Sequence, residues 1–113
     1  MTPEQQRIAI AEACGWTKLK QHPEISFLIY GQVPKIEGQA WSSSHFPIPD
    51  YPNDLNAMHE AELVFIGEDK SPNYFDYRQQ LYRVCCLSSE LAVRATAAQR
   101  AEAFLRTLNL WTL

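Results

Sequence analysis

The chain has 113 residues, a net charge of −3 at pH 7, 46% apolar residues and 20% charged residues. This length is enough for one domain with one hydrophobic core, and the composition argues against a disordered chain. The weak negative charge disfavours a duplex-DNA partner, because duplex binding needs a basic surface. No run approaches the roughly 20 apolar residues of a membrane-spanning helix, so we expect no membrane partner. We therefore predict a single domain over residues 1–113.

The cysteines and the N-terminal segment predict a cytoplasmic protein. The three cysteines are an odd number, and the opening MTPEQQRIA lacks the apolar run of a secretory signal. In a reduced compartment such cysteines act as small apolar residues. Adjacent Cys85 and Cys86 point in different directions on a helix or a strand, which disfavours joint metal binding.

A first helix is predicted to begin after Thr2. The segment from Thr2 to Gln5 is a capping box, with Pro3 at the first helical position. Gly15 is a typical stop at the end of such a helix, after which Trp16 can fold back onto the core.

The middle of the chain is predicted to form strand and loop. Residues 25–30 are rich in β-branched and aromatic side chains and read as a strand. Residues 33–36 are a candidate partner strand, confined to a sheet edge by a proline. Residues 38–49 contain aromatic residues, serines and prolines, and we expect an ordered loop there.

Three further helices follow in the sequence. Apolar residues at helical spacing predict a helix over residues 53–65, ended by Gly67. A helix over residues 72–86, with Ser71 as its cap and Pro72 at its first position, is favoured, with a strand over 81–87 as the alternative. Residues 91–93 read as a short strand or extended segment.

The last helix begins with a second capping box, formed by Thr96 and Gln99. Glu102 and Arg106 are spaced for an ion pair on its outer face, and Asn109 can end it. The elements together predict an α+β fold, a layer-type domain with three to four helices packed on a small β-sheet or hairpin. The buried stripe of the last helix consists of Ala101, Phe104, Leu105 and Leu108.

Two blocks of the chain resemble a known family. They are DYPNDLNAMHEAE, which ends at residue 62, and ATAAQRAEAFLRTLNLW, over residues 95–111. Both are similar to segments of small phage and prophage proteins of the phage alpha-beta-alpha sandwich type, and the helix ending in Gly15 and Trp16 agrees. The resemblance implies an α/β layer structure and a phage-like gene product in the cytoplasm of a bacterial host. It implies no catalytic residue, because the family has no established activity.

Catalytic and metal motifs are incomplete. His59 and Glu60 start a zinc-protease pattern, but its second histidine is replaced by Leu63. His59 and Glu62 can share a helix face, yet we interpret them as an exposed surface because no further zinc-type ligand accompanies them. The serines at 42–44 beside His45 lack the elbow motif of a hydrolase. We therefore predict no enzyme, no metal and no cofactor.

Aromatic and basic residues instead predict a binding protein. Aromatic rings stack on nucleobases, and arginines neutralise phosphates. Our hypothesis is a non-enzymatic protein that binds a nucleotide, for example a counter-defence protein that sequesters a nucleotide immune signal. The alternative is a protein-interaction module that inhibits a host or defence protein, and in either case a homo-oligomer is plausible. An equally ordinary role for these rings is to fill the core. The candidate ligand-binding residues are Trp41, Phe46, Tyr51, Arg78 and Arg83.

Overall fold

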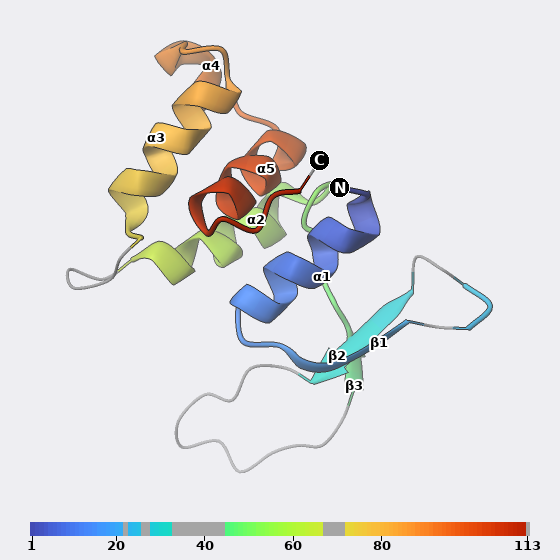
Figure 1. The fold of residues 1–113 in the computed structure, drawn as a ribbon. Helices are drawn as coiled ribbons and strands as arrows, with labels where there is room; N and C mark the ends of the chain where they lie inside the picture. The colour runs from blue at the N-terminus through green and yellow to red at the C-terminus, as the bar shows by residue number, and fades with distance from the viewer. Residues whose placement is uncertain (22, 26–27, 33–44, 67–71, 113) are drawn as a thin grey trace.

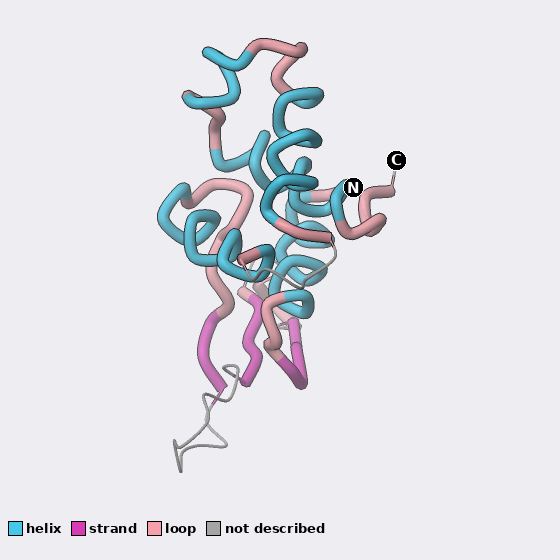
Figure 2. Tube along the Cα trace, turned by 90° about the vertical axis from the view of Figure 1, so that its left-hand side faces the viewer, coloured by secondary structure: helices cyan, strands magenta, loops and turns pink. Residues whose placement is uncertain are grey.

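The elements of the fold are those of an α+β protein, as predicted. The computed structural model describes residues 1–21, 23–25, 28–32, 45–66 and 72–112. Figures 1 and 2 show the helices packed together, with the sheet projecting at one end. In chain order the elements are α1 (Pro3–Ala13), β1 (Thr17–Gln21), β2 (Ile29–Gln32), β3 (His45–Pro47), α2 (Leu55–Ala61), the 3-10 helix η1 (Glu62–Phe65), α3 (Tyr74–Val84), α4 (Ser89–Val93) and α5 (Ala97–Thr107).

Local capping signals account for the starts of the longer helices. The capping boxes predicted at Thr2 and Thr96 are both present, before α1 and α5. Asn73 caps α3 with Asp76 as its partner, so the predicted cap at residues 71–72 is wrong. Asparagine and serine are equally good caps, because both side-chain oxygens accept from backbone N–H groups of the first helical turn. The sequence therefore does not distinguish a helix capped by Ser71 from one capped by Asn73.

Helix α3 is confirmed over the competing strand, but two other boundaries differ from the prediction. The helix predicted over 53–65 is α2 followed by η1, with Asp54 as its cap. Residues 91–93, predicted as extended, belong to α4. The side chain of Ser88 accepts from the backbone N–H of Leu91 at 3.2 Å, and this cap starts a short helix where the apolar triplet suggested a strand.

The sheet has β2 at its centre, paired antiparallel with β1 and with β3. The strand predicted over 25–30 begins later, at Ile29, and the predicted partner at 33–36 lies outside the described residues. Neither β1 nor β3 was predicted. The first is almost entirely polar, with Leu19 as its one apolar residue, and the second is a three-residue part of the predicted loop. Both depend on backbone pairing with β2 rather than on a local apolar pattern.

Close packing at Gly31 joins the strands to the chain before them. A methyl group on this residue would collide with the side chain of Leu19 and lie 3.3 Å from the ring of Trp16. Gly31 therefore lets β1 approach the centre of the sheet.

The core lies among the helices, with α5 in its middle. The ring centroids of Phe65 and Tyr77 are 5.1 Å apart and stacked, and Phe104 of α5 lies 5.0 Å from Phe65. These rings join η1, α3 and α5 into one apolar layer. Each of the three side chains is fully buried.

A buried arginine connects α1 to the chain between β3 and α2. Arg7 donates from Nη2 to the carbonyl of Ile48 at 2.9 Å, and its Nε lies 3.9 Å from a carboxylate oxygen of Asp50. The two termini meet nearby, where the N-terminal amine of Met1 donates to the carbonyl of Thr112 at 3.0 Å. Arg7 thus ties α1 to the segment that leads from β3 to α2.

Candidate functional site

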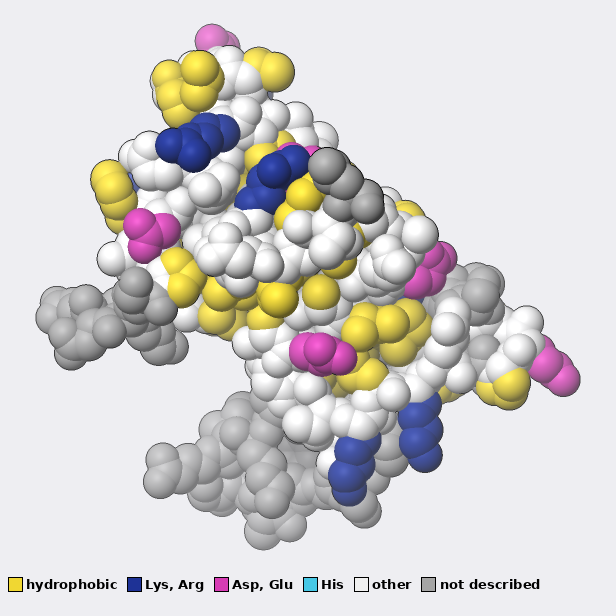
Figure 3. Space-filling view, viewed as in Figure 1, with side chains coloured by type: hydrophobic (Ala, Val, Ile, Leu, Met, Phe, Trp, Pro, Cys, Tyr) yellow, Lys and Arg dark blue, Asp and Glu magenta, His cyan; other side chains and the backbone are white. Residues whose placement is uncertain are grey.

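A groove of about 650 Å³ lies where α3, α4 and α5 meet. Its volume is within the range of small-molecule sites, which is about 300–1,000 Å³. The space-filling view shows basic atoms beside hydrophobic ones over α3 and α4 (Figure 3). The lining residues are Tyr74, Phe75, Arg78, Gln79, Leu81 and Tyr82 of α3, Ser89, Ala92 and Val93 of α4, and Arg100 of α5.

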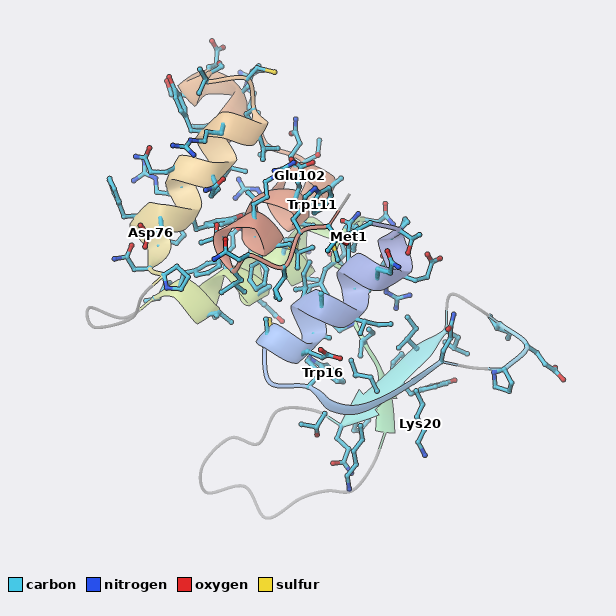
Figure 4. The ribbon with its side chains drawn as sticks, in the orientation of Figure 1. Met1, Trp16, Lys20, Asp76, Glu102 and Trp111 are labelled. Carbon is cyan, nitrogen blue, oxygen red and sulfur yellow. The ribbon has the colours of Figure 1, made fainter. Side chains whose placement is uncertain are left out.

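The spacing of residues along α3 explains which side chains reach the groove. Tyr74, Arg78 and Tyr82 are four residues apart, so they lie on one helix face with about 6 Å of rise between neighbours. Arg78 therefore has an aromatic ring one turn before it and another one turn after it. Asp76, labelled in Figure 4, belongs to the N-terminal cap of α3. It is two positions from Tyr74 and from Arg78, about 160° around the helix from both, so it is not part of this stripe.

The groove is positively biased, because its described lining residues include two guanidinium groups and no carboxylate. Arg78 is exposed, and no carboxylate of the described residues lies within ion-pair distance of it. Arg100 differs, since its Nη1 lies 2.9 Å from Oε1 of Glu62. The groove therefore combines one solvated cation at its rim with one neutralised cation deeper in the fold.

Glu62 lies at the centre of a buried polar network beneath the groove. Its Oε1 accepts from the hydroxyl of Tyr77 at 2.9 Å as well as from Arg100. Burial and the charge of Glu62 both raise the pKa of Tyr77, so this hydroxyl stays protonated and remains a donor. Burial opposes the charge on Arg100, but the hydrogen bond and the charge of Glu62 outweigh it and raise the pKa of Arg100.

The pair of His59 and Glu62, considered above as a metal candidate, is only partly at the surface. His59 is exposed and its Nδ1 lies 3.8 Å from Oε2 of Glu62, whereas Glu62 itself is buried. The interpretation of both residues as an exposed face is therefore wrong for Glu62. Among the described residues, His, Cys, Asp and Glu side chains form no cluster of three that could hold a metal.

The structure does not gather the four described members of the five sequence-predicted ligand residues at one place. Arg78 lines the groove, whereas Arg83 is exposed in the last turn of α3, outside the groove lining. The two arginines are five positions apart in the sequence, which places them about 140° apart around the helix. Phe46 is 43% exposed and belongs to β3, in the sheet at the other end of the molecule. Trp41 lies outside the described residues.

Tyr51 belongs to the core rather than to a ligand surface. It is 4% exposed, and its hydroxyl shares hydrogen bonds with the thiol of Cys14 and the side chain of Trp16. Burial raises the pKa of Tyr51, with a smaller contribution from Cys14. Its hydroxyl is thus occupied by structural partners.

The thiols of Cys14, which is half-buried, and Cys85, which is buried, are poorly suited to nucleophilic chemistry. Burial raises the pKa of Cys14 to about 11, although the hydrogen bond from Tyr51 lowers it in part. Burial also raises the pKa of Cys85. Both side chains remain protonated near neutral pH, and the thiol is a much weaker nucleophile than the thiolate.

Three groove residues were missed by the sequence-based choice of ligand residues. Tyr74 and Tyr82 were recognisable from the sequence, because they are spaced four residues on either side of Arg78 in a predicted helix. Arg100 carried no such signal, since its place at the groove depends on how α5 packs against α3.

No protein-family model, curated protein or solved structure matches this chain. The resemblance to phage proteins therefore stays a prediction. In the described part of the chain, no helix is both long and apolar enough to cross a membrane.

Proposed function

We propose that this protein binds, without catalysis, a small ligand with an aromatic ring and an anionic group, of which a nucleotide is the leading example. The single observation that carries the proposal is the stripe of Tyr74, Arg78 and Tyr82 along the groove. Tyrosine rings offer faces for a nucleobase, and a guanidinium is a strong partner for phosphate. The described lining residues include no carboxylate, which supports an anionic ligand.

Two features of the groove support a small ligand. Its volume of about 650 Å³ can hold one nucleotide. Arg78 has no carboxylate partner in the described residues, so a ligand phosphate would not have to displace an internal anion from it.

The biological use of this binding is proposed from the resemblance to phage and prophage proteins. A protein that binds a nucleotide without converting it can act by sequestration. We propose sequestration of a nucleotide immune signal as that use.

Thermal unfolding with a panel of nucleotides tests the proposal. At a ligand concentration ten times the Kd, binding stabilises by about 1.4 kcal/mol, which raises the Tm by roughly 5 °C. Tyr82→Ala should lose most of this shift, because it removes one stacking face. Phe46→Ala is the matched substitution of an exposed ring on the sheet and should keep it. If Phe46→Ala loses the rise in Tm and Tyr82→Ala keeps it, the nucleotide binds at the sheet and not in the groove. If no nucleotide raises the Tm of the unmodified protein, a nucleotide ligand is refuted.

A protein partner is the second candidate, favoured by apolar side chains around the groove. Twelve large apolar residues are exposed among the described ones, and six of them fall between residues 74 and 93. A segment of this length would hold fewer by chance. Leu91 is one of them and lies outside the groove lining. Arg78 and Arg83 of α3 form no ion pair within the described part of the chain, so they would suit an acidic partner surface. This function would be favoured if the protein binds a defined protein partner, if Leu91→Asp abolishes that binding, and if nucleotides do not bind.

A further inference from the structure

Arg100 is held in a fixed direction at the floor of the groove. Its Nε donates to the carbonyl of Ala95 at 3.3 Å and its Nη1 donates to Glu62 at 2.9 Å. The side chain is 11% exposed and lines the groove. Tyr77 is a further hydrogen-bonding neighbour of this guanidinium, but a guanidinium carries five N–H donors, so these contacts leave donors of Arg100 for a ligand. Arg100 therefore offers directed donors to whatever enters the groove.

The positive charge of Arg100 is largely neutralised by Glu62 at the floor of the groove. The side chain of Glu62 is 7% exposed and forms a direct ion pair with Arg100. A phosphate at the floor would be attracted by Arg100 but repelled by Glu62, and it would lose its own hydration. A neutral acceptor, such as a carbonyl oxygen or a ring nitrogen, meets only the hydrogen-bond donors and loses less hydration.

The rim presents the opposite electrostatic situation. Arg78 is exposed and without an ion-pair partner in the described residues. A phosphate placed against it keeps part of its hydration while it gains a charge-assisted hydrogen bond. The groove thus separates a site for neutral acceptors from a site for an anion.

We infer that the groove orients its ligand, with the acceptor atoms of a planar ring against Arg100 at the floor and the anionic group against Arg78 at the rim. This inference rests on the proposed function and narrows its ligand class. The best fit is a nucleoside monophosphate whose base carries acceptors on its edge. Guanine fits this description, because its O6 and N7 are both acceptors and pair well with arginine.

Calorimetric titration with guanosine and with GMP tests the orientation. In the unmodified protein GMP should bind at least about fivefold more tightly than guanosine, because it adds the contact to Arg78. In Arg78→Gln this advantage should disappear, while the affinity for guanosine stays within about twofold. Arg94→Gln is the matched control, since it removes one exposed arginine outside the groove lining and should keep the advantage.

Two other outcomes separate this inference from the proposed function. If GMP keeps its advantage over guanosine in Arg78→Gln, the phosphate is not at the rim and the orientation is overturned, although the groove still binds. If neither guanosine nor GMP binds the unmodified protein, both the orientation and the nucleotide proposal are overturned. Glu62→Gln gives an independent check, because a phosphate at the floor would gain more than tenfold from loss of that carboxylate charge. With the phosphate at the rim, we expect the ratio of the GMP affinity to the guanosine affinity to differ less than threefold between Glu62→Gln and the unmodified protein.

Discussion

At the scale of single residues, the ion pair of Glu62 and Arg100 serves both the core and the groove. Nη1 of Arg100 lies 2.9 Å from Oε1 of Glu62, and the side chains of Glu62 and Arg100 are 7% and 11% exposed. Tyr77 donates to the same carboxylate, so removal of Glu62 leaves a buried guanidinium and a buried hydroxyl without their acceptor.

Glu62→Ala should therefore destabilise the protein by about 3 kcal/mol, as measured by urea unfolding. The pair of Glu102 and Arg106 provides the control, because its distance is also 2.9 Å but its side chains are 29% and 42% exposed. Glu102, labelled in Figure 4, is on the outer side of α5. Glu102→Ala should cost about 0.5 kcal/mol or less. Equal losses in the two variants would show that burial of the Glu62 pair has no special role.

The raised pKa of the Cys14 thiol leads us to predict that the protein loses stability in alkaline solution. Burial raises its pKa from 9.0 to about 11, so the folded state holds this proton more tightly than the unfolded state. The resulting stabilisation is complete below pH 9 and is lost as the pH rises toward 11. Urea unfolding across this range should show a smaller decline for Cys14→Ala, in which Tyr51 and Tyr77 still contribute. Parallel declines in the two proteins would contradict the assignment to Cys14.

At the scale of elements, the turn between α3 and α4 sets the shape of the groove. Cys86 and Leu87 both have a φ of 59°, in the left-handed region. The backbone N–H of Leu87 donates to the carbonyl of Tyr82 at 2.9 Å, which closes the turn and brings α4 beside α3. A left-handed conformation costs a residue with a side chain about 1 kcal/mol, so the turn is strained.

Leu87→Gly should raise the free energy of unfolding by about 0.5 kcal/mol, because glycine adopts the left-handed region freely. Leu87 is 62% exposed, so little apolar burial is lost. Leu91→Gly is the control at a similarly exposed leucine within α4, and it should lower stability by about 1 kcal/mol. Urea unfolding of the two variants distinguishes the effects. A loss of similar size in both would contradict the strain assigned to the turn.

The elements also show how far the sequence can predict this fold. Helices α1 and α5 were predictable because each begins with a capping box, a signal contained within four residues. Strand β1 was not, because its polar residues become a strand only by pairing with β2. Helix α4 has five residues and no buried side chain, so no apolar periodicity marks it.

The same distinction applies to the candidate site. Arg78 was predicted, and its tyrosine neighbours follow from helical spacing. The contact of Glu62 with Arg100 joins residues 38 positions apart, and no local pattern of the sequence indicates it. The floor of the groove was therefore beyond sequence-based prediction, although its rim was not.

At the scale of the whole molecule, an acidic chain carries a groove with a positive bias. The net charge is −3, yet the part of the groove lining that the structure describes contains arginines and no carboxylate. The groove lies among the helices, away from the sheet and from Trp16 and Lys20 at the other end (Figure 4). Ligand binding should therefore alter the stability of the α3–α5 region with little effect on the sheet.

Native mass spectrometry of the protein purified from bacteria, beside the Arg78→Gln variant, is the most direct test of nucleotide binding in the groove. We expect an adduct of nucleotide mass, either co-purified or formed when nucleotide is added, that disappears on denaturation and is much reduced in Arg78→Gln. The same spectra report the oligomeric state. A clean protein mass that stays unchanged when nucleotides are added would contradict the claim, and the protein-interaction function would then become the leading one.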